Sequence, residues 1–363
     1  PELRKAAVAA LGRLGDPSAV PALVASLDSP TWGLPQAAAS ALGAIGDVRA
    51  VDALVSALDA PSEWVRRTAS EALGALGDRR AVRALMGVLA DQSAQVRRVA
   101  ALALGAIGDP DAGVALASLL GPLPDSIPGA SRPADVAAEG TASSGTPRVA
   151  AEVSGDPVPA VRCAAASALG DIGDVRAAPA LIASLSDGDV QVRAIAVWAL
   201  GQVGNGHALE PLVVALGDRS SEVREAAVDA LTGLGRVAVP RLVSLAEDGP
   251  RYVRCRAAQA LGRIGDPDAV APLITMLSGP DEWLRRAAAS ALGELGDVAS
   301  VDPLIGALAD SDEATRAAAA QALGRLGDTG ALPALIESMA DLAPSVRAAA
   351  AEALVSLSAH LAD

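Results

Sequence analysis

Aromatic residues and lysine are nearly missing from this chain of 363 residues. It contains no phenylalanine, one tyrosine and four tryptophans, and Lys5 is its only lysine. Alanine and leucine must therefore form the interior, which predicts a thin core in which helices approach one another closely. We interpret the use of arginine in place of lysine as the coding bias of a bacterium or archaeon with GC-rich DNA or a salty habitat.

Histidine is equally scarce, and this excludes several kinds of catalytic chemistry. The two histidines, His207 and His360, are far apart in the sequence. A catalytic triad or a multi-histidine metal site needs several such groups converging on one point. We therefore expect no catalytic residue, no bound metal and no cofactor, and we predict that the protein is not an enzyme.

Net positive charge and long apolar runs are absent as well. The formal net charge is −14 at pH 7, whereas nucleic-acid binding depends mainly on Lys and Arg contacts to phosphates. No apolar run approaches the roughly 20 residues of a membrane-spanning helix, and no signal peptide is recognisable. We expect neither nucleic acid nor membrane as a partner and predict a cytoplasmic protein. Because the chain starts at Pro1 rather than Met, we expect a partial form of a longer protein.

What the chain does contain is a six-residue phrase, Leu-Gly-x-Leu/Ile-Gly-Asp, that returns along its whole length. Its copies, some of them imperfect, are 31 residues apart except for one spacing of 30 and one of 65. A fixed period in this range is the signature of a solenoid, in which each repeat packs only against its neighbours. The copies start at Leu11, Leu42, Leu73, Leu104, Leu169, Leu200, Leu231, Leu261, Leu292, Leu323 and Leu354.

Each period predicts a pair of helices joined by a short polar break. Apolar residues recur at i, i+3, i+4 and i+7 over residues 79–90 (helix A) and again over residues 96–107 (helix B). Gly108 stands where a helix needs a left-handed cap, and Asp109 and Pro110 are typical of the start of the next helix. We therefore interpret the recurring Gly-Asp as capping, since a phosphate-binding loop would need a lysine and a preceding strand.

The predicted fold is all-α, an α-α superhelix (α-solenoid) with one leading helix B over residues 1–14 and about ten A–B hairpins. We predict a single solenoid over residues 1–363, interrupted by 34 extra residues that produce the spacing of 65. The insertion lies within residues 121–157, a segment rich in Pro, Gly, Ala, Ser and Thr, and we interpret it as a flexible excursion rather than an ordered lid. The uncovered apolar side of the first helix predicts either missing upstream sequence or a contact surface.

The repeated pattern Val-Arg-x-x-Ala-Ala-x-Ala-Leu-Gly-x-Ile-Gly-Asp, followed by Ala-Val-x-x-Leu, resembles the HEAT-repeat family. It is most similar to the short-repeat subclass named after phycobilisome lyases (PBS lyase HEAT-like repeats), and the resemblance covers the chain except for the insertion. It is specific for the fold but not for function, because similar folds perform unrelated tasks. It implies that helix B lines the concave side of the solenoid and that Asp and Arg form a ladder between repeats.

The two columns of this ladder are visible in the sequence. A guanidinium can bond carboxylates and helix-end carbonyls of adjacent repeats at once; the alternative is a row of arginines that binds an anionic ligand. Gly33 and Pro35 interrupt the arginine column, and we expect them to distort the start of their helix B. The arginines are Arg4, Arg66, Arg97, Arg162, Arg193, Arg224, Arg254, Arg285, Arg316 and Arg347, and the acids, six residues earlier, are Asp91, Asp187, Asp218, Asp248, Asp310 and Asp341.

The helix-B positions that the fold leaves free predict the partner-binding surface, because large aromatics and arginine dominate protein-binding hot spots. Trp198 lies in the middle of a helix B, and we interpret it as a contact. For Trp64 and Trp283, near helix starts, the alternative is that the rings only cover the ends of helix packing. One cluster comprises Trp64, Arg67, Glu71 and Arg98; the other comprises Tyr252, Cys255, Arg256, Trp283 and Arg286.

Two functions follow from these features. The first is a non-enzymatic scaffold that binds a protein or peptide along the concave helix-B surface. The second, implied by the subclass, is a bilin lyase subunit or chaperone-like factor for tetrapyrrole attachment, in which Cys163 or Cys255 holds the pigment. These cysteines share one column three repeats apart, roughly 25–30 Å at ~8–10 Å per packed helix, too far for a disulfide. Their alternative role is that of small residues tolerated on a helix surface.

Overall fold

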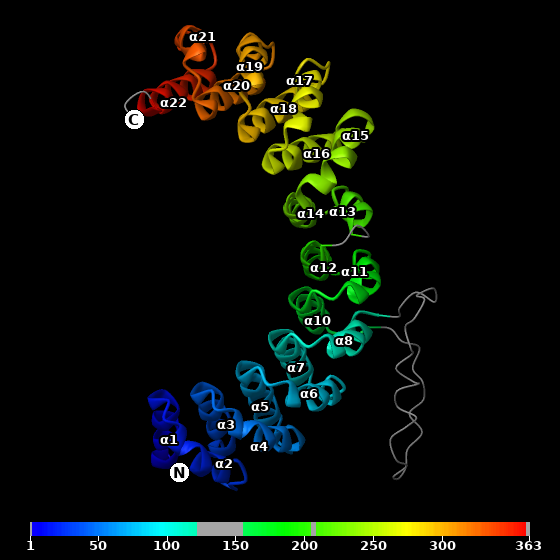
Figure 1. Ribbon diagram of the computed structural model, residues 1–363, viewed down its shortest axis with the longest axis vertical. Coiled ribbons are helices and arrows are strands. Elements are labelled where there is room, and N and C mark those ends of the chain that lie inside the picture. Colours follow the sequence, from blue (N-terminus) through cyan, green and yellow to red (C-terminus); the bar gives the residue numbers. More distant parts are fainter. Residues whose placement is uncertain (1, 122–154, 205–207, 361–363) are drawn as a thin grey trace. The chain divides into compact units, whose positions relative to one another are not determined.

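The computed structural model describes residues 2–121, 155–204 and 208–360. These residues form α-helices and short 3₁₀-helices and no strand, which confirms the all-α prediction (Figure 1). Most of the predicted insertion, residues 121–157, lies outside the described residues, and so does His207.

The described helices form one leading helix B followed by ten A–B hairpins, as predicted. The helices B are α1 (Glu2–Leu14), α3 (Leu34–Ile45), α5 (Glu63–Leu76), α7 (Ala94–Ile107), α10 (Pro159–Ile172), α12 (Val190–Val203), α14 (Ser221–Leu234), α16 (Arg251–Ile264), α18 (Glu282–Leu295), α20 (Glu313–Leu326) and α22 (Pro344–His360). The helices A are α2 (Val20–Leu27), α4 (Val51–Ser56), α6 (Val82–Val88), α8 (Gly113–Leu120), α11 (Ala178–Ser184), α13 (Leu209–Ala215), α15 (Val239–Asp248), α17 (Val270–Leu277), α19 (Val301–Ala307) and α21 (Leu332–Ser338).

Helix A is shorter than the sequence pattern predicted, because most copies begin with a separate 3₁₀ turn. In the third hairpin the turn covers Arg79–Ala81 and α6 starts only at Val82. The Asp78 carboxylate accepts a hydrogen bond from the Arg80 N–H at 2.9 Å, and the Ala81 N–H donates to the Asp78 carbonyl at 3.1 Å. These short-range bonds tighten the chain into three residues per turn. The Gly-Asp pair therefore acts as a cap, as interpreted from the sequence.

Adjacent helices B pack through a glycine of the repeated phrase against an alanine of the next repeat. A Cβ added at Gly74 would lie 2.9 Å from the Ala103 Cα, and one at Gly293 would lie 2.6 Å from the Ala322 Cα. Alanine and leucine fill the interior between the helices, as expected for a chain so poor in aromatic residues. The first leucine of the phrase is fully buried in most copies, namely Leu42, Leu73, Leu104, Leu169, Leu200, Leu231, Leu261, Leu292 and Leu323.

The second repeat differs at the start of its helix B, as predicted. Helix α3 begins at Leu34, two residues later in the repeat than α5, and ends in register with it at Ile45. Gly33 adopts a left-handed conformation (φ 77°), and Pro35 is accommodated in the first turn, where its missing N–H costs no hydrogen bond. The ladder arginine is thus absent from this repeat.

The chain divides into two compact units, residues 1–208 and 209–363. Within each unit the helices B lie side by side in one row, and each except the leading α1 packs on its own helix A (Figure 1). The same repeat continues in both units, while the predicted single solenoid over residues 1–363 stays a prediction. None of the described helices is both long enough and apolar enough to cross a membrane.

Candidate functional site

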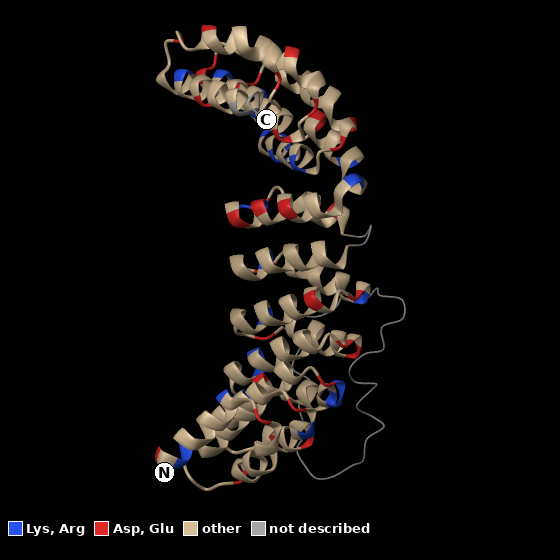
Figure 2. Cartoon of the chain, turned by 60° about the vertical axis from the view of Figure 1, so that its left-hand side comes forward, with Lys and Arg blue, Asp and Glu red and all other residues tan. Residues whose placement is uncertain are grey.

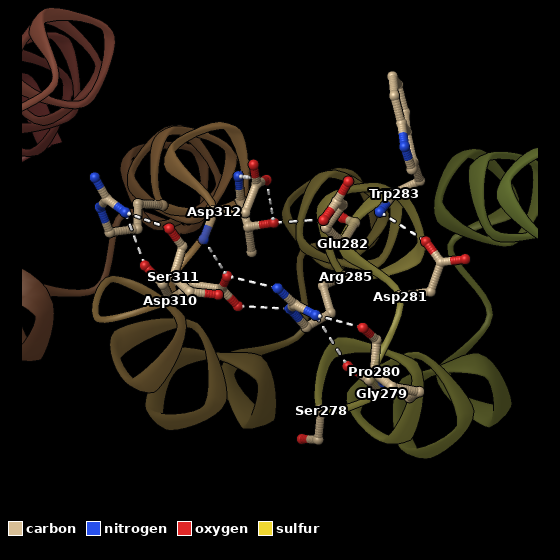
Figure 3. A network of polar contacts seen from close by, with 12 residues as sticks. Ser278, Gly279, Pro280, Asp281, Glu282, Trp283, Arg285, Asp310, Ser311 and Asp312 are labelled. Atoms are coloured by element: carbon tan, nitrogen blue, oxygen red, sulfur yellow. Dashed lines mark hydrogen bonds and ion pairs between the residues drawn. The ribbon is translucent and has the colours of Figure 1, made fainter.

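The arginine ladder connects consecutive repeats through one guanidinium and one carboxylate (Figure 3). Arg285 donates from Nε and Nη2 to the two carboxylate oxygens of Asp310 at 2.6 and 2.8 Å, and from Nη1 to the carbonyls of Gly279 and Pro280 at 3.2 and 3.1 Å. Asp310 in turn accepts from the Asp312 N–H at 2.8 Å. One side chain therefore ties the start of α18 to the turn of the following hairpin.

The same two-pronged pair recurs in other repeats. Nε and Nη2 of the arginine bind the next repeat's carboxylate in Arg66–Asp91, Arg97–Asp156, Arg162–Asp187 and Arg316–Asp341. Asp156 was missed in the sequence because the insertion precedes it, although its position six residues before Arg162 was a usable signal. The Asp156 N–H also donates to the Leu119 carbonyl at 2.8 Å, so the two ends of the insertion lie side by side.

These pairs use the guanidinium donors for structure and leave little to bind a ligand. The hydrogen bond from Arg285 holds the pKa of Asp310 below its usual value, so the carboxylate is ionised at neutral pH. In Arg66–Asp91 the two side chains are 9% and 10% exposed. In the five repeats with such a pair, the structural interpretation of the arginine column therefore holds against the anion-binding alternative.

Not every predicted ladder residue forms such a pair. Arg4 is exposed at the start of the chain. Asp248 is also exposed, because α15 continues through it to a length of ten residues instead of ending earlier. Arg254 accordingly turns its Nε to the Ala246 carbonyl, at 2.8 Å. The assignment of Asp248 to the ladder was wrong, and the shortened spacing of 30 residues in this repeat explains it.

The helix-B face of the second unit is hollowed beside the second predicted cluster. One hollow of about 610 Å³ runs across α16, α18, α20 and α22, with a floor of alanines and a rim that includes Gln259, Ser290 and Gln321. A second hollow of about 620 Å³ lies at the starts of α14, α16 and α18. Cys255, Arg256 and Trp283 line both hollows. The two hollows together form the candidate site.

The structure brings the second predicted cluster together around Trp283, which is 49% exposed. The Arg286 guanidinium stacks 4.3 Å from the ring centre, and Arg251 lies 6.0 Å from it. The Cys255 thiol lies 3.8 Å from the Trp283 carbonyl. Figure 3 shows the indole pointing away from the ladder network, so the ring does not cover it. Tyr252, 55% exposed, lines the second hollow.

Three charged residues near this site, Arg251, Arg263 and Asp281, were missed from the sequence. Arg251 binds Asp281 at 2.6 Å, and Glu225 on α14 binds Arg256 at 2.7 Å and Arg263 at 2.7 Å. Figure 2 shows the acidic residues along α14. Pairs between neighbouring repeats, about 30 positions apart in the sequence, give no local pattern, and only the helix stacking shows them.

The first predicted cluster is only partly assembled. Arg67 lies 4.8 Å from the Trp64 ring centre and 3.6 Å from the Glu71 carboxylate, so these three residues of α5 form a contiguous exposed group. Arg98, on α7, donates instead to Gln95 at 3.3 Å. Trp64 is 51% exposed. The spacing of Trp64, Arg67 and Glu71 within one helix was sufficient to predict the group on α5. Among the described residues, no contact joins Arg98 to this group.

Trp198 packs over a neighbouring helix as well as facing solvent. It is 40% exposed, and its Cζ3 atom would lie 2.7 Å from a Cβ added at Gly170. The ring therefore fills the space that the glycine of α10 leaves open. Trp198 belongs to the first compact unit, whereas Tyr252, Arg256, Trp283 and Arg286 belong to the second.

The surroundings of both cysteines raise the pKa of their thiols. Burial raises the pKa of Cys163, with a further contribution from Asp189, and burial and Asp281 raise the pKa of Cys255. Because the thiolate is the reactive form, a raised pKa lowers reactivity at neutral pH. In the part of the chain that the structure describes, no group of three or more His, Cys, Asp or Glu is placed to hold a metal ion.

We expect both thiols to be alkylated by iodoacetamide at pH 8 more slowly than a cysteine in an unstructured peptide. The physical reason is the smaller thiolate fraction that burial leaves at that pH. Mass spectrometry of timed samples measures the two rates separately. A rate for Cys255 equal to or above that of the free peptide would contradict the assignment of a suppressed thiol.

The stacked hairpins define the class of protein as an α-solenoid, and comparison with known families identifies it further. A profile of HEAT repeats matches most of the chain, and the profile of the PBS lyase HEAT-like repeat matches residues 161–187. The chain therefore belongs to the HEAT-repeat family. The first profile matches residues 1–71, 51–127, 179–250, 239–313 and 274–355.

Similar solved structures show the same fold. Kap121p is 13% identical, with coverage of 93% of this chain and 41% of that chain and a TM-score of 0.61. Importin beta is 16% identical, with coverage of 95% and 52% and a TM-score of 0.54, so this chain spans about half of its length. The CpcE–CpcF complex of phycocyanin lyase from Nostoc is 27% identical over 41% of this chain and 99% of that chain. Its TM-score is 0.39. A comparison with curated proteins found no match.

Proposed function

We propose that this chain is a non-enzymatic scaffold that binds a protein or peptide on the helix-B surface, with Trp283 at the centre of the site. The observation that carries the proposal is the pair of hollows of about 610 and 620 Å³ that share Trp283, Cys255 and Arg256. An exposed indole flanked by arginines at the edge of a hollow has the composition of a binding hot spot. A cytoplasmic location remains a prediction.

Two further features support this proposal. A solenoid presents a long, rigid row of helix surfaces whose free positions can vary without loss of the fold. Kap95p, whose structure has a TM-score of 0.55 with this chain, was solved in complex with RanGDP. That likeness, at 14% identity, establishes the fold only. The smaller group of Trp64, Arg67 and Glu71 on α5 is a second candidate contact, in the first unit.

The alternative function in tetrapyrrole attachment receives less support from the cysteines. A pigment held covalently requires a thiolate, and burial raises the pKa of both Cys163 and Cys255. A simple optical measurement separates the two functions. A pigment-binding protein would gain strong visible absorption when mixed with a bilin, whereas the proposed scaffold would not.

The proposal predicts that replacing Trp198 and Trp283 by alanine weakens partner binding without loss of helical structure. The chain is immobilised, partners are captured from its native host, and mass spectrometry compares the wild type with the double variant. Because a hot-spot residue contributes about 2 kcal/mol or more, we expect at least a roughly tenfold loss of captured partner.

Trp32 provides a matched control for this experiment. It is 86% exposed and lies beside Lys5, outside the helix-B columns. Trp32→Ala should leave capture unchanged, and circular dichroism checks that all variants stay folded. If a folded Trp198/Trp283 double variant retains its partner at the wild-type level, binding occurs elsewhere and the proposed site is wrong. If the variant unfolds, the tryptophans are core residues.

A further inference from the structure

Beside the candidate site, one arginine of the ladder, Arg224, lacks its carboxylate partner. We call this unfilled carboxylate position the vacancy. Arg224 on α14 donates from Nη1 to the carbonyls of Asp218 and Arg219 at 2.8 and 3.2 Å, as Arg66, Arg97, Arg285, Arg316 and Arg347 do in their own repeats. Its Nε and Nη2, which bind a carboxylate in five other repeats, find no acceptor among the described residues. Two charged donors with a fixed geometry are therefore left for another group.

The shortened repeat explains why the chain itself does not fill this position. The acceptor lies 25 residues after the arginine in most repeats, and here that position is Gly249. A Cβ added at Gly249 would lie 2.6 Å from the Leu245 carbonyl oxygen, so no aspartate fits there. Asp248, one residue earlier, is exposed at the end of α15.

The joint between α14 and α16 also differs from the other joints. Thr232 stands where the other repeats have the glycine of the phrase, and its hydroxyl donates to the Val228 carbonyl at 2.8 Å. A side chain at this position prevents the close glycine–alanine approach seen elsewhere in the stack. Ion pairs of Glu225 with Arg256 and Arg263, and of Asp229 with Arg263, connect the two helices instead.

Arg224 lines the second hollow, where the vacancy is accessible. The side chains that line it carry four positive charges and one negative charge, from Arg219, Arg224, Arg251, Arg256 and Asp218. Arg251 and Arg256 are already paired with the carboxylates of Asp281 and Glu225, whereas Arg224, among the described residues, binds only backbone carbonyls. Tyr252 and Trp283 form an aromatic wall of the same hollow.

We propose that this hollow binds an aspartate or glutamate side chain of a partner peptide, whose carboxylate takes the place of the missing ladder acid on Arg224. The same guanidinium atoms hold a carboxylate with two hydrogen bonds in five other repeats, so the geometry selects a carboxylate. An apolar or aromatic residue next to the acid packs on Tyr252 and Trp283. The inference rests on the proposed scaffold function and names the chemistry of its partner.

The test uses the full chain and a phage-displayed library of short random peptides. Wild-type protein should enrich peptides with an Asp or Glu next to an apolar or aromatic residue. One enriched peptide is then synthesised with a fluorescent label, together with a version in which the acid is replaced by its amide. Fluorescence anisotropy measures the affinity of both peptides for wild-type and variant proteins.

Arg224→Gln and the amide peptide should each weaken binding roughly tenfold or more, as expected for hydrogen bonds to a charged group. Their combination should cause little further loss, because both changes remove the same contact. Arg224→Lys keeps the charge but loses the two-pronged geometry, and should also weaken binding. Arg83→Gln, which removes one exposed arginine from α6, is the matched control and should have no effect.

Several outcomes would overturn the inference. Enriched peptides without an acid, or equal affinity of a folded Arg224→Gln variant, would show that the vacancy is not used. If such acid-free peptides depend on Trp283, the scaffold function stands while the carboxylate assignment falls. A library without any enriched peptide also contradicts the inference, and the capture experiment with the tryptophan variants then decides the scaffold function separately.

Discussion

An Arg66→Ala variant should be less stable than the wild type by about 3 kcal/mol. Removing one partner of a buried ion pair leaves the other charge without compensation, at a cost of about 3–5 kcal/mol. The side chains of Arg66 and Asp91 are still 9% and 10% exposed to solvent. Because water can reach the remaining charge, we expect a cost at the lower end of that range. The variant also loses the hydrogen bonds of Arg66 to the carbonyls of Ala60 and Pro61, at 2.9 and 3.0 Å.

Thermal and urea unfolding, followed by circular dichroism, measure this loss. Repeat proteins unfold as a series of coupled neighbours, so the first transition of the curve is the one to compare. Arg49→Ala is the matched control: Arg49 also pairs with an aspartate, Asp47, but its side chain is 61% exposed. The Arg49→Ala control should change the midpoint of the unfolding transition only slightly. Equal shifts in the two variants would show that burial does not set the strength of the ladder.

The repeat architecture was predictable because the same local chemistry is written many times. The leucine of the phrase is buried, the first glycine allows the next helix to approach, and the second glycine and the aspartate end one helix and begin the next. A copy of the phrase that departs from the pattern does not obscure the prediction, because the other copies repeat the same pattern. The 3₁₀ turn over Arg79–Ala81 was missed because its apolar pattern is the same as that of an α-helix beginning at residue 79.

Prediction was weaker where one repeat departs from the others. Asp248 satisfies the six-residue spacing to Arg254, but the loss of one residue in this repeat turns it to solvent. The same irregularity leaves Arg224 without its carboxylate, a feature that the sequence alone did not suggest. The register of the acid depends on where α15 ends, and that depends on packing rather than on local pattern.

The candidate site shows the same limit. Trp283 and Arg286, three residues apart on one helix, were predicted together and lie together, and so do Trp64 and Arg67. The ion pairs that Glu225 and Arg251 form with residues of neighbouring repeats were not predicted. Residues three or four apart on a helix share a face by geometry alone, whereas contacts between helices depend on the offset between stacked repeats.

Replacing Gly293 by alanine should destabilise the second unit by about 1–2 kcal/mol, although alanine favours helices. The substitution gains up to about 1 kcal/mol of helix propensity. Against this, the new Cβ would lie 2.6 Å from the Ala322 Cα and Cβ, far inside the ~3.5–4.0 Å at which carbon atoms attract. Helices α18 and α20 must move apart, and overpacking of this kind costs about 1–3 kcal/mol.

Gly87 provides the matched control, because it also lies within a helix, α6, but a Cβ there meets no atom within 4 Å. Gly87→Ala should raise the unfolding midpoint, since only the propensity gain remains. The two substitutions are chemically identical, so opposite signs in thermal unfolding would isolate the helix contact as the cause. A stabilised Gly293→Ala variant would contradict the close approach of α18 and α20. The glycine–alanine contact also explains why the joint between α14 and α16 differs. Thr232 takes the place of the glycine there, so α14 and α16 are connected by ion pairs instead.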